Sequence, residues 1–129
     1  MSDFSDALAV TAGGLRSQAT RLRVLSENIA NTDTPGYRRK LVSFDAVMRD
    51  APEGVLGPGR VQLDRTELER VFDPSHPMAD ESGHYDGSNV NLLVEIADAR
   101  EASRSYEANL KMFDQIRRMS GGLMDLLRR

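Results

Sequence analysis

The side chains that could do chemistry gather in one short stretch of this sequence. Two histidines stand there among carboxylates, in the order Asp73, His76, Asp80, Glu81 and His84. Imidazole nitrogens and carboxylate oxygens are ligands that zinc uses in proteins. The spacing matches no standard metal-binding motif, and the stretch is rich in proline and glycine. We therefore expect no metal site here.

No other pattern in the chain points to catalysis or to a cofactor. The sequence contains no phosphate-binding loop, no nucleophile elbow and no helix with paired zinc-binding histidines. Its 129 residues include no cysteine, which excludes disulfides and thiolate chemistry. We expect no enzyme, no cofactor and no small-molecule substrate.

The elements that flank this stretch are two long helices, one towards each end of the chain. The first is predicted from about Ser2 to Asn31 and the second from 91 to 127, with Asn89 or Asn91 as its cap. At a rise of about 1.5 Å per residue, these helices would be about 45 and 55 Å long. Both lengths exceed the diameter of a compact globule of this size, so the molecule should be elongated.

Each predicted helix carries an apolar stripe at coiled-coil spacing. The two stripes include Phe4, Leu8, Leu15, Leu22, Leu25 and Ile29, then Leu92, Ile96, Ala99, Ser103, Tyr106, Leu110 and Phe113. Residues at this spacing lie on one side of a helix and need a partner surface. Periodicity alone leaves open whether the partner is the other helix or a neighbouring subunit. The residues that we expect to pack between subunits are Leu8, Leu15, Leu22, Leu25, Ile29, Leu92, Ile96, Tyr106, Leu110, Phe113 and Leu123.

Each helix also contains a pair of glycines, Gly13-Gly14 and Gly121-Gly122. A glycine in a helix interior costs about 1 kcal/mol relative to alanine. Each pair marks either a locally weak helix or a point where another backbone comes close. If the helices run antiparallel with the termini together, both pairs would allow close helix approach near one end.

The first helix ends at a strong stop signal. Pro35 disfavours helical geometry at Thr34, and Gly36 supplies the positive φ of a tight turn. The alternating stretch Arg38–Asp45 predicts a strand, and residues 46–88 read as an extended segment that could form a hairpin supported by the helices or a neighbour. We predict a mainly α fold, with two long terminal helices in an antiparallel coiled-coil-like pair and a short extended or β-hairpin middle segment.

The charge is unevenly distributed along the chain. The formal net charge is −3, but residues 46–88 hold four basic against nine acidic residues, while each helical end is close to neutral. The ends can therefore pack against copies of themselves, and the total gives no drive towards nucleic acid. No apolar run approaches the roughly 18 residues of a membrane span. The first residues lack the basic region of a cleaved secretory signal.

Two sequence motifs resemble those of the bacterial flagellar rod, hook and hook–filament junction proteins. The first runs from Ser26 to Arg38 and reads SENIANTDTPGYR; the second comprises Asn89-Val90-Asn91, Glu95 and the run SRSYEAN from Ser103 to Asn109. The motif residues carried over from this family are Asn28, Asn31, Thr34, Pro35, Gly36, Tyr37, Ser103, Arg104, Tyr106 and Asn109. The short middle segment, with Val71–Asp80 and Gly83, is similar to the C-type members of the proximal rod, although His76 stands where asparagine would be common.

The resemblance implies a structural subunit of the proximal rod that assembles helically around the export channel and transmits motor torque to the hook. It implies a rod core domain made of residues 1–36 and 89–129, with residues 37–88 as the middle segment. The implied partners are copies of itself, other proximal-rod proteins, the inner-membrane ring and export gate at the base, and the distal rod above. The implied location is the rod within the periplasm, reached through the flagellar type III apparatus without signal cleavage.

Other interpretations stay open. A soluble coiled-coil adaptor or secretion chaperone would be a stable helical oligomer alone, whereas a rod subunit would have frayed termini and need partners. An enzyme would depend on His76 or His84. Of the motif asparagines Asn28 and Asn31, we expect one to end its helix and at least one to bond a neighbouring backbone. Arg104 is expected on a solvated face, or else in an ion pair between subunits.

Overall fold

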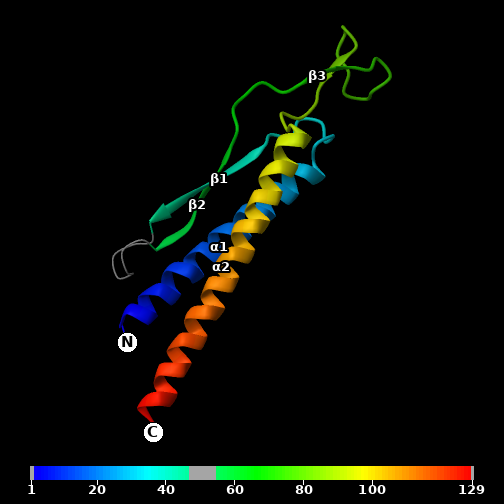
Figure 1. The fold of residues 1–129 in the computed structure, drawn as a ribbon. Coiled ribbons are helices and arrows are strands. Elements are labelled where there is room, and N and C mark those ends of the chain that lie inside the picture. Colours follow the sequence, from blue (N-terminus) through cyan, green and yellow to red (C-terminus); the bar gives the residue numbers. More distant parts are fainter. Residues whose placement is uncertain (1, 47–54, 129) are drawn as a thin grey trace.

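The computed structural model describes residues 2–46 and 55–128, which form two long helices and two small antiparallel sheets (Figure 1). Helix α1 spans Ser2–Ala30 and helix α2 spans Leu92–Leu127. The helices lie side by side and antiparallel, so both chain ends lie at the same end of an elongated molecule. The predicted mainly α fold with a paired-helix frame is confirmed. Neither helix is long and apolar enough to span a membrane.

A hairpin follows α1 and packs against it. Its first strand is the one predicted at Arg38–Asp45, and its second strand comes from residues 46–88, so it is not the hairpin expected within 46–88 alone. Strand β1, Lys40–Ala46, pairs antiparallel with strand β2, Leu56–Leu63, and the register shifts between Val42 and Phe44. Both strands contact α1. A lone two-stranded hairpin is marginal in water, and the helix supplies the support that it needs.

A second, smaller hairpin projects from the end of the molecule opposite the termini (Figure 1). It consists of strand β3, Arg70–Phe72, and strand β4, His84–Asp86. Among the described elements these two strands contact only each other. The chain enters β4 through Gly83, whose φ of 80° favours glycine, and a Cβ there would lie 2.9 Å from the Phe72 ring.

The boundaries of both helices follow from local chemistry. After α1, Tyr37 N donates to Thr34 O at 3.1 Å, and Gly36 has a φ of 74°. Proline at the second position and a positive φ at the third fit a type II turn. Helix α2 is capped by Asn91, whose side chain accepts from Val94 N at 3.4 Å. Of the two expected caps Asn91 is correct.

The glycine pairs differ from each other. A Cβ on Gly14 would lie 2.8 Å from Asn109 Oδ1, so α2 does approach α1 closely there, and α1 continues through the pair without a break. No atom lies within 4 Å of a Cβ on Gly121 or Gly122. The hypothesis of close approach is wrong for Gly121-Gly122. The α1 glycine pair lies opposite Asn109, and Gly121 lies about 18 Å further along α2 than Asn109.

The hydrophobic core of the chain is small. The buried apolar side chains among the described residues are Val24, Leu25, Val55 and Ala102. Large exposed apolar side chains are far more numerous and lie mostly on α2: Leu92, Leu93, Val94, Ile96, Leu110, Met112, Met119, Leu123, Met124, Leu126 and Leu127. Since most helix stability in proteins comes from burial of an apolar face, much of α2 gains little from this fold alone.

Candidate functional site

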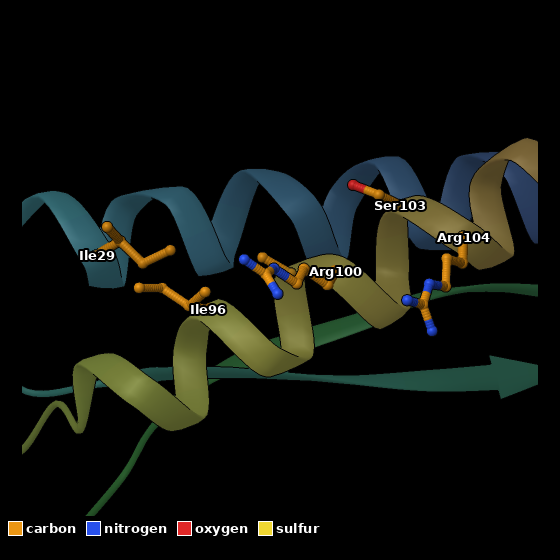
Figure 2. Close-up of a pocket in the computed structure, with 6 residues that line it drawn as sticks. Ile29, Ile96, Arg100, Ser103 and Arg104 are labelled. Atoms are coloured by element: carbon orange, nitrogen blue, oxygen red, sulfur yellow. The ribbon is translucent and has the colours of Figure 1, made fainter.

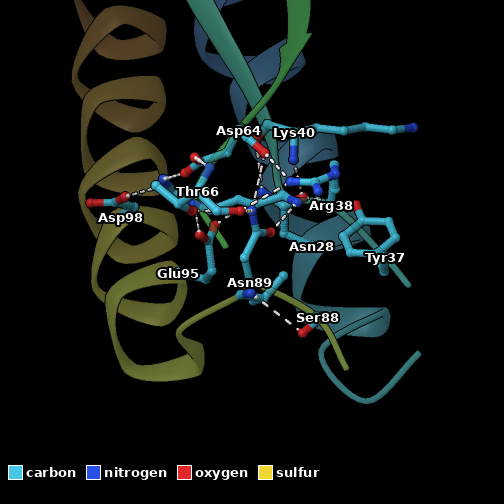
Figure 3. Close-up of polar contacts among 12 residues, drawn as sticks. Asn28, Tyr37, Arg38, Lys40, Asp64, Thr66, Ser88, Asn89, Glu95 and Asp98 are labelled. Carbon is cyan, nitrogen blue, oxygen red and sulfur yellow. Dashed lines mark hydrogen bonds and ion pairs between the residues drawn. The ribbon is translucent and has the colours of Figure 1, made fainter. Parts of the chain in front are cut away.

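A cluster of polar side chains joins the end of α1, the start of β1 and the start of α2 (Figure 3). At its centre Asn28 and Glu95, 67 residues apart in sequence, are both 0% exposed. Asn28 Nδ2 donates to Glu95 Oε2 at 3.2 Å and to the Lys40 carbonyl at 2.9 Å. The Asn28 amide therefore ties both helices and β1 together at one point.

The carbonyl side of the Asn28 amide is equally occupied. Its Oδ1 accepts from Lys40 N at 2.9 Å and from the Tyr37 hydroxyl at 2.8 Å. Asn28 thus uses both donors and both acceptor positions of its amide, as a fully buried amide must. The expectation that a motif asparagine bonds a neighbouring backbone is confirmed for Asn28. Asn31 Nδ2 donates to the carbonyl of Glu27 at 2.8 Å, within the last turn of α1. Asn31 is therefore the motif asparagine that ends the helix.

The buried Glu95 carboxylate is balanced by Arg39. Arg39 Nε donates to Glu95 Oε1, and the guanidinium also faces Asp64 Oδ2 at 3.5 Å and Asp98 Oδ2 at 3.7 Å. A buried carboxylate without a partner would cost several kcal/mol, so this pair is what allows Glu95 to stay inside. Burial is the largest single influence on Arg39 and opposes its charge, but the hydrogen bonds and negative charges of Glu95 and Asp64 together outweigh burial and raise the pKa of Arg39.

The Asn89-Val90-Asn91 motif performs two separate tasks. Asn89 Oδ1 accepts from Arg39 N at 2.6 Å, and its Nδ2 donates to the carbonyls of Asp64 and Thr66 at 3.1 and 3.2 Å. Asn89 therefore holds β1 and the chain after β2 beside the start of α2, where Asn91 is the cap. Motif residues from both halves of the chain thus meet where α1 ends and α2 begins.

The Thr34-Pro35-Gly36-Tyr37 turn is fixed by the same cluster. Gly36 N donates to the carbonyls of Asp86 and Gly87 at 3.1 Å each, and the Ser88 hydroxyl donates to Thr32 O. Burial raises the pKa of Tyr37, whose hydroxyl donates to Asn28. The turn positions the second hairpin relative to the helices.

The histidine and carboxylate stretch forms no common site. Asp73 accepts from the Ser75 hydroxyl at 2.7 Å, and the His76 ring stacks on Tyr85 at 3.9 Å. His84 packs against Phe72. Within residues 2–46 and 55–128, no three His, Asp or Glu side chains are placed to hold one metal ion.

In the same stretch, Asp80 organises the chain before β4. Its Oδ1 accepts from the Ser82 hydroxyl at 2.6 Å, and its Oδ2 pairs with Arg70 at 2.6 Å. Hydrogen bonds from Ser82 and Arg70 hold the pKa of Asp80 well below its usual range. Asp80 is therefore a structural carboxylate of the hairpin.

The side of α2 that meets α1 carries small and polar residues. Glu95 and Ala102 are fully buried, and Asn109 packs on Gly14. These three α2 residues are seven apart, so they lie on one side of the helix. The predicted apolar stripe lies beside them and is only partly covered: Leu92, Ile96 and Leu110 are exposed, whereas Ala99, Tyr106 and Phe113 are half-buried.

The predicted packing residues are divided between the core and the surface. Leu25 is buried in the chain's own core, and Leu8, Leu15, Leu22, Ile29, Tyr106 and Phe113 are half-buried, whereas Leu92, Ile96, Leu110 and Leu123 are exposed. Ile29 and Ile96 point toward one another across the helices and border a shallow groove of about 320 Å³, also lined by Ala99, Arg100, Ser103 and Arg104 (Figure 2). Arg104 is exposed, as expected for a solvated face.

Sequence reasoning missed the roles of Arg39 and Asp64. Arg39 is the middle of three consecutive basic residues, so nothing local separates it from Arg38 and Lys40. Glu95 belonged to a recognised motif, but its burial depends on Asn28 and Arg39. The one available signal was the motif itself, since a recurring polar residue beside a helix start suggests a tertiary partner.

Two family models match this chain, one in each half. The model described as "Flagella basal body rod protein" matches residues 8–38, and the one described as "Flagellar basal body rod FlgEFG protein C-terminal" matches residues 81–126. The polar cluster joins residues from both matched regions. Fold and motifs together define a flagellar rod protein.

Curated relatives narrow the family further. Three flagellar basal-body rod proteins FlgC are 42%, 33% and 31% identical to this chain, from Agrobacterium fabrum, Aquifex aeolicus and Salmonella typhimurium respectively. The alignments cover 99%, 88% and 85% of this chain and 98%, 89% and 87% of the relatives. The chain belongs to the FlgC family of flagellar basal-body rod proteins, whose members are structural subunits of the rod.

Proposed function

We propose that this chain builds the proximal part of the rod by burying the exposed stripe of α2 against neighbouring subunits. The observation that supports this proposal is which side of α2 faces α1. Because Glu95, Ala102 and Asn109 face α1, the apolar residues Leu92 and Leu110 remain exposed. Burial of such surface is worth about 25 cal/mol per Å² and would favour assembly over the free chain.

In this proposal the polar cluster is the rigid joint of the subunit. The Asn28–Glu95 hydrogen bond and the Arg39–Glu95 ion pair fix the register of the two helices before neighbouring subunits bind. The outer surface then gains order when copies pack helically around the export channel, with the middle segment outward. A joint that does not slip would let the subunit transmit torque from motor to hook.

The partners that we propose are copies of this chain and other proximal-rod proteins, with the inner-membrane ring and export gate below and the distal rod above. The location that we propose is the rod within the periplasm. The small hydrophobic core of the single chain suits export through the flagellar type III apparatus, because a chain that buries little apolar surface has a low free energy of unfolding.

The test is a substitution that alters only the exposed stripe. Leu110→Asp should leave expression and the fold of the free chain intact, because Leu110 is exposed, and should abolish incorporation into rods and swimming. Basal bodies purified from cells that carry only the variant report incorporation, and soft-agar spreading reports motility. The neighbouring substitution Lys111→Asp, also on the surface, is the matched control and should retain both.

Normal swimming of the Leu110→Asp strain would contradict the proposal. A coiled-coil adaptor or secretion chaperone gives a different result. In that case the protein would be absent from purified basal bodies, and the free chain would be a stable helical oligomer. Leu22→Asp tests the α1 stripe in the same assay. Because Leu22 is half-buried, circular dichroism must show that this variant still folds.

A further inference from the structure

The loop that joins β3 and β4 lies at the end of the molecule opposite the termini (Figure 1). Three of its side chains each accept a hydrogen bond from the backbone N–H two residues further along. Asp73 and Asp80 do so with a carboxylate oxygen, at 3.2 and 2.9 Å. His76 does so with Nδ1, which accepts from Met78 N at 3.1 Å. Imidazole is the acceptor of this kind that ordinarily takes up a proton between about pH 8 and pH 5.

The hydrogen bond from Met78 fixes which nitrogen of the His76 ring carries the proton. A backbone N–H can only donate, so Nδ1 holds a lone pair and the ring hydrogen of His76 is on Nε2. The His76 ring stacks on Tyr85, with 3.9 Å between the ring centroids, and this contact fixes the plane of the ring. Protonation would place a hydrogen on Nδ1, facing the Met78 N–H. Two donors would then face each other, and this hydrogen bond would be lost.

The second histidine of the hairpin has the opposite arrangement. Ser82 Oγ donates its single hydrogen to Asp80 Oδ1 at 2.6 Å and lies 3.1 Å from His84 Nδ1. Ser82 can therefore only accept from the ring, so the ring hydrogen of His84 is on Nδ1. Hydrogen bonds from Ser82 and Arg70 hold the pKa of Asp80 well below its usual range, so its carboxylate stays charged in mild acid. Protonation of His84 adds a hydrogen at Nε2 and leaves the bond to Ser82 in place.

The charged groups around the two rings belong to the hairpin, because β3 and β4 contact only each other among the described elements. Arg70 of β3 pairs with Asp80 and Asp86 at 2.6 and 2.9 Å. Tyr85 of β4 is the titratable group that lies against His76. The other acidic residues of this segment are Glu67, Glu69, Asp73 and Glu81. Within residues 2–46 and 55–128, the ion pairs of the hairpin are those of Arg70, so no carboxylate pairs with the His76 ring.

We propose that His76 makes this loop a pH-sensitive switch: protonation of its ring releases the Met78 backbone, while the bond between His84 and Ser82 keeps the rest of the hairpin closed. The Met78 bond is complete when the ring is neutral, and it is lost as the pH falls. Met78 is 63% exposed, so the switch alters a surface that another chain can contact. The switch is a property of the free chain and does not depend on the proposed function.

The first test is the position of the ring hydrogens. The purified full chain, labelled with ¹⁵N, would be studied by NMR at about pH 8, where imidazole is ordinarily neutral. Long-range correlations between ring protons and ring nitrogens distinguish the two neutral forms of each histidine. We expect the hydrogen on Nε2 in His76 and on Nδ1 in His84. The same form in both rings would overturn the proposal.

The second test is hydrogen exchange of single backbone amides, compared at about pH 8 and pH 5 after correction for the intrinsic exchange rate. Protection of the Met78 amide should fall by about two- to tenfold in acid, the change expected for one lost hydrogen bond. The His84 amide donates to Asp80 Oδ1 at 3.2 Å and should keep its protection. The His84 amide thus reports whether the hairpin as a whole stays closed.

His76→Asn is the matched variant. An asparagine side-chain oxygen can accept from the N–H two residues further along, and it does not titrate in this range. The variant should therefore protect the Met78 amide equally at both pH values. In His84→Gln the ring that titrates at the other position is gone, and the response of Met78 to acid should persist.

Three outcomes of the exchange experiment would overturn the switch. Equal protection of the Met78 amide of the native chain at both pH values would show that acid does not break its bond. An acid response that persists in His76→Asn would assign the effect to another group. Loss of protection at His84 together with Met78 would mean that acid opens the whole hairpin and not one turn of its loop.

Discussion

At the scale of residues, the Asn28, Arg39 and Glu95 cluster is the most consequential feature of this chain. Asn28 and Glu95 are completely buried, and together with Arg39 they connect α1, β1 and α2. Buried polar groups add little net stability when paired but cost heavily when a partner is removed. The cluster therefore specifies one arrangement of the helices.

Substitution of Glu95 by glutamine tests this role. Glu95→Gln keeps the side-chain shape but removes the charge that Arg39 contacts, and should lower the free energy of unfolding by about 1.5–3 kcal/mol. Urea denaturation of the purified chain measures the change. The matched control is Glu101→Gln on the same helix, since Glu101 is 69% exposed and faces Arg21 at 3.5 Å. Its effect should stay within about 0.5 kcal/mol, and equal effects of the two substitutions would contradict a structural role for the cluster.

At the scale of elements, alanine substitutions of Gly14 and Gly121 distinguish the effect of contact between the helices from the effect of helix propensity. Gly121→Ala should stabilise α2 by up to about 1 kcal/mol, because alanine favours the helix and no atom lies within 4 Å of its Cβ. Gly14→Ala should forfeit that gain, since its Cβ would lie 2.8 Å from Asn109 Oδ1. Thermal unfolding followed by circular dichroism compares the two variants.

Room for the new methyl group can be made on the opposite helix. Asn109→Ala removes the side-chain atoms that the Cβ of Gly14→Ala would meet, so the double variant should regain stability relative to Gly14→Ala. Asn109 also donates to Ser105 O at 2.9 Å, so the single variant Asn109→Ala is needed as a reference. Additive effects of the two substitutions would show that Gly14 and Asn109 are not in contact.

At the scale of the whole molecule, stability should decrease from the polar cluster towards the chain ends. Residues 95–109 of α2 pack on α1, whereas residues 121–128 are exposed throughout. In the free chain, hydrogen exchange should be faster in 117–127 than in 95–109, because local opening there breaks few tertiary contacts. Mass spectrometry of the free and the rod-assembled protein compares the two segments. Equal protection in the free chain would mean that the end of α2 is already covered.

The sequence by itself determined the helices and the turn, and it narrowed the cap of α2 to Asn89 or Asn91. Helix periodicity, the Pro35-Gly36 stop and a capping asparagine act over a few neighbouring residues, so they can be read without knowing the fold. The same local signals indicated the strand that became β1. The motif pair also indicated the family that the comparisons then established.

Only the tertiary structure decided which side of α2 faces inward. An apolar stripe predicts that the stripe itself is buried, yet the inner face here is Glu95, Ala102 and Asn109. That choice depends on Asn28 and Gly14, which lie more than sixty residues away in sequence. A polar or small inner face has no hydrophobic signature, because its stability comes from specific partners rather than from burial of apolar area.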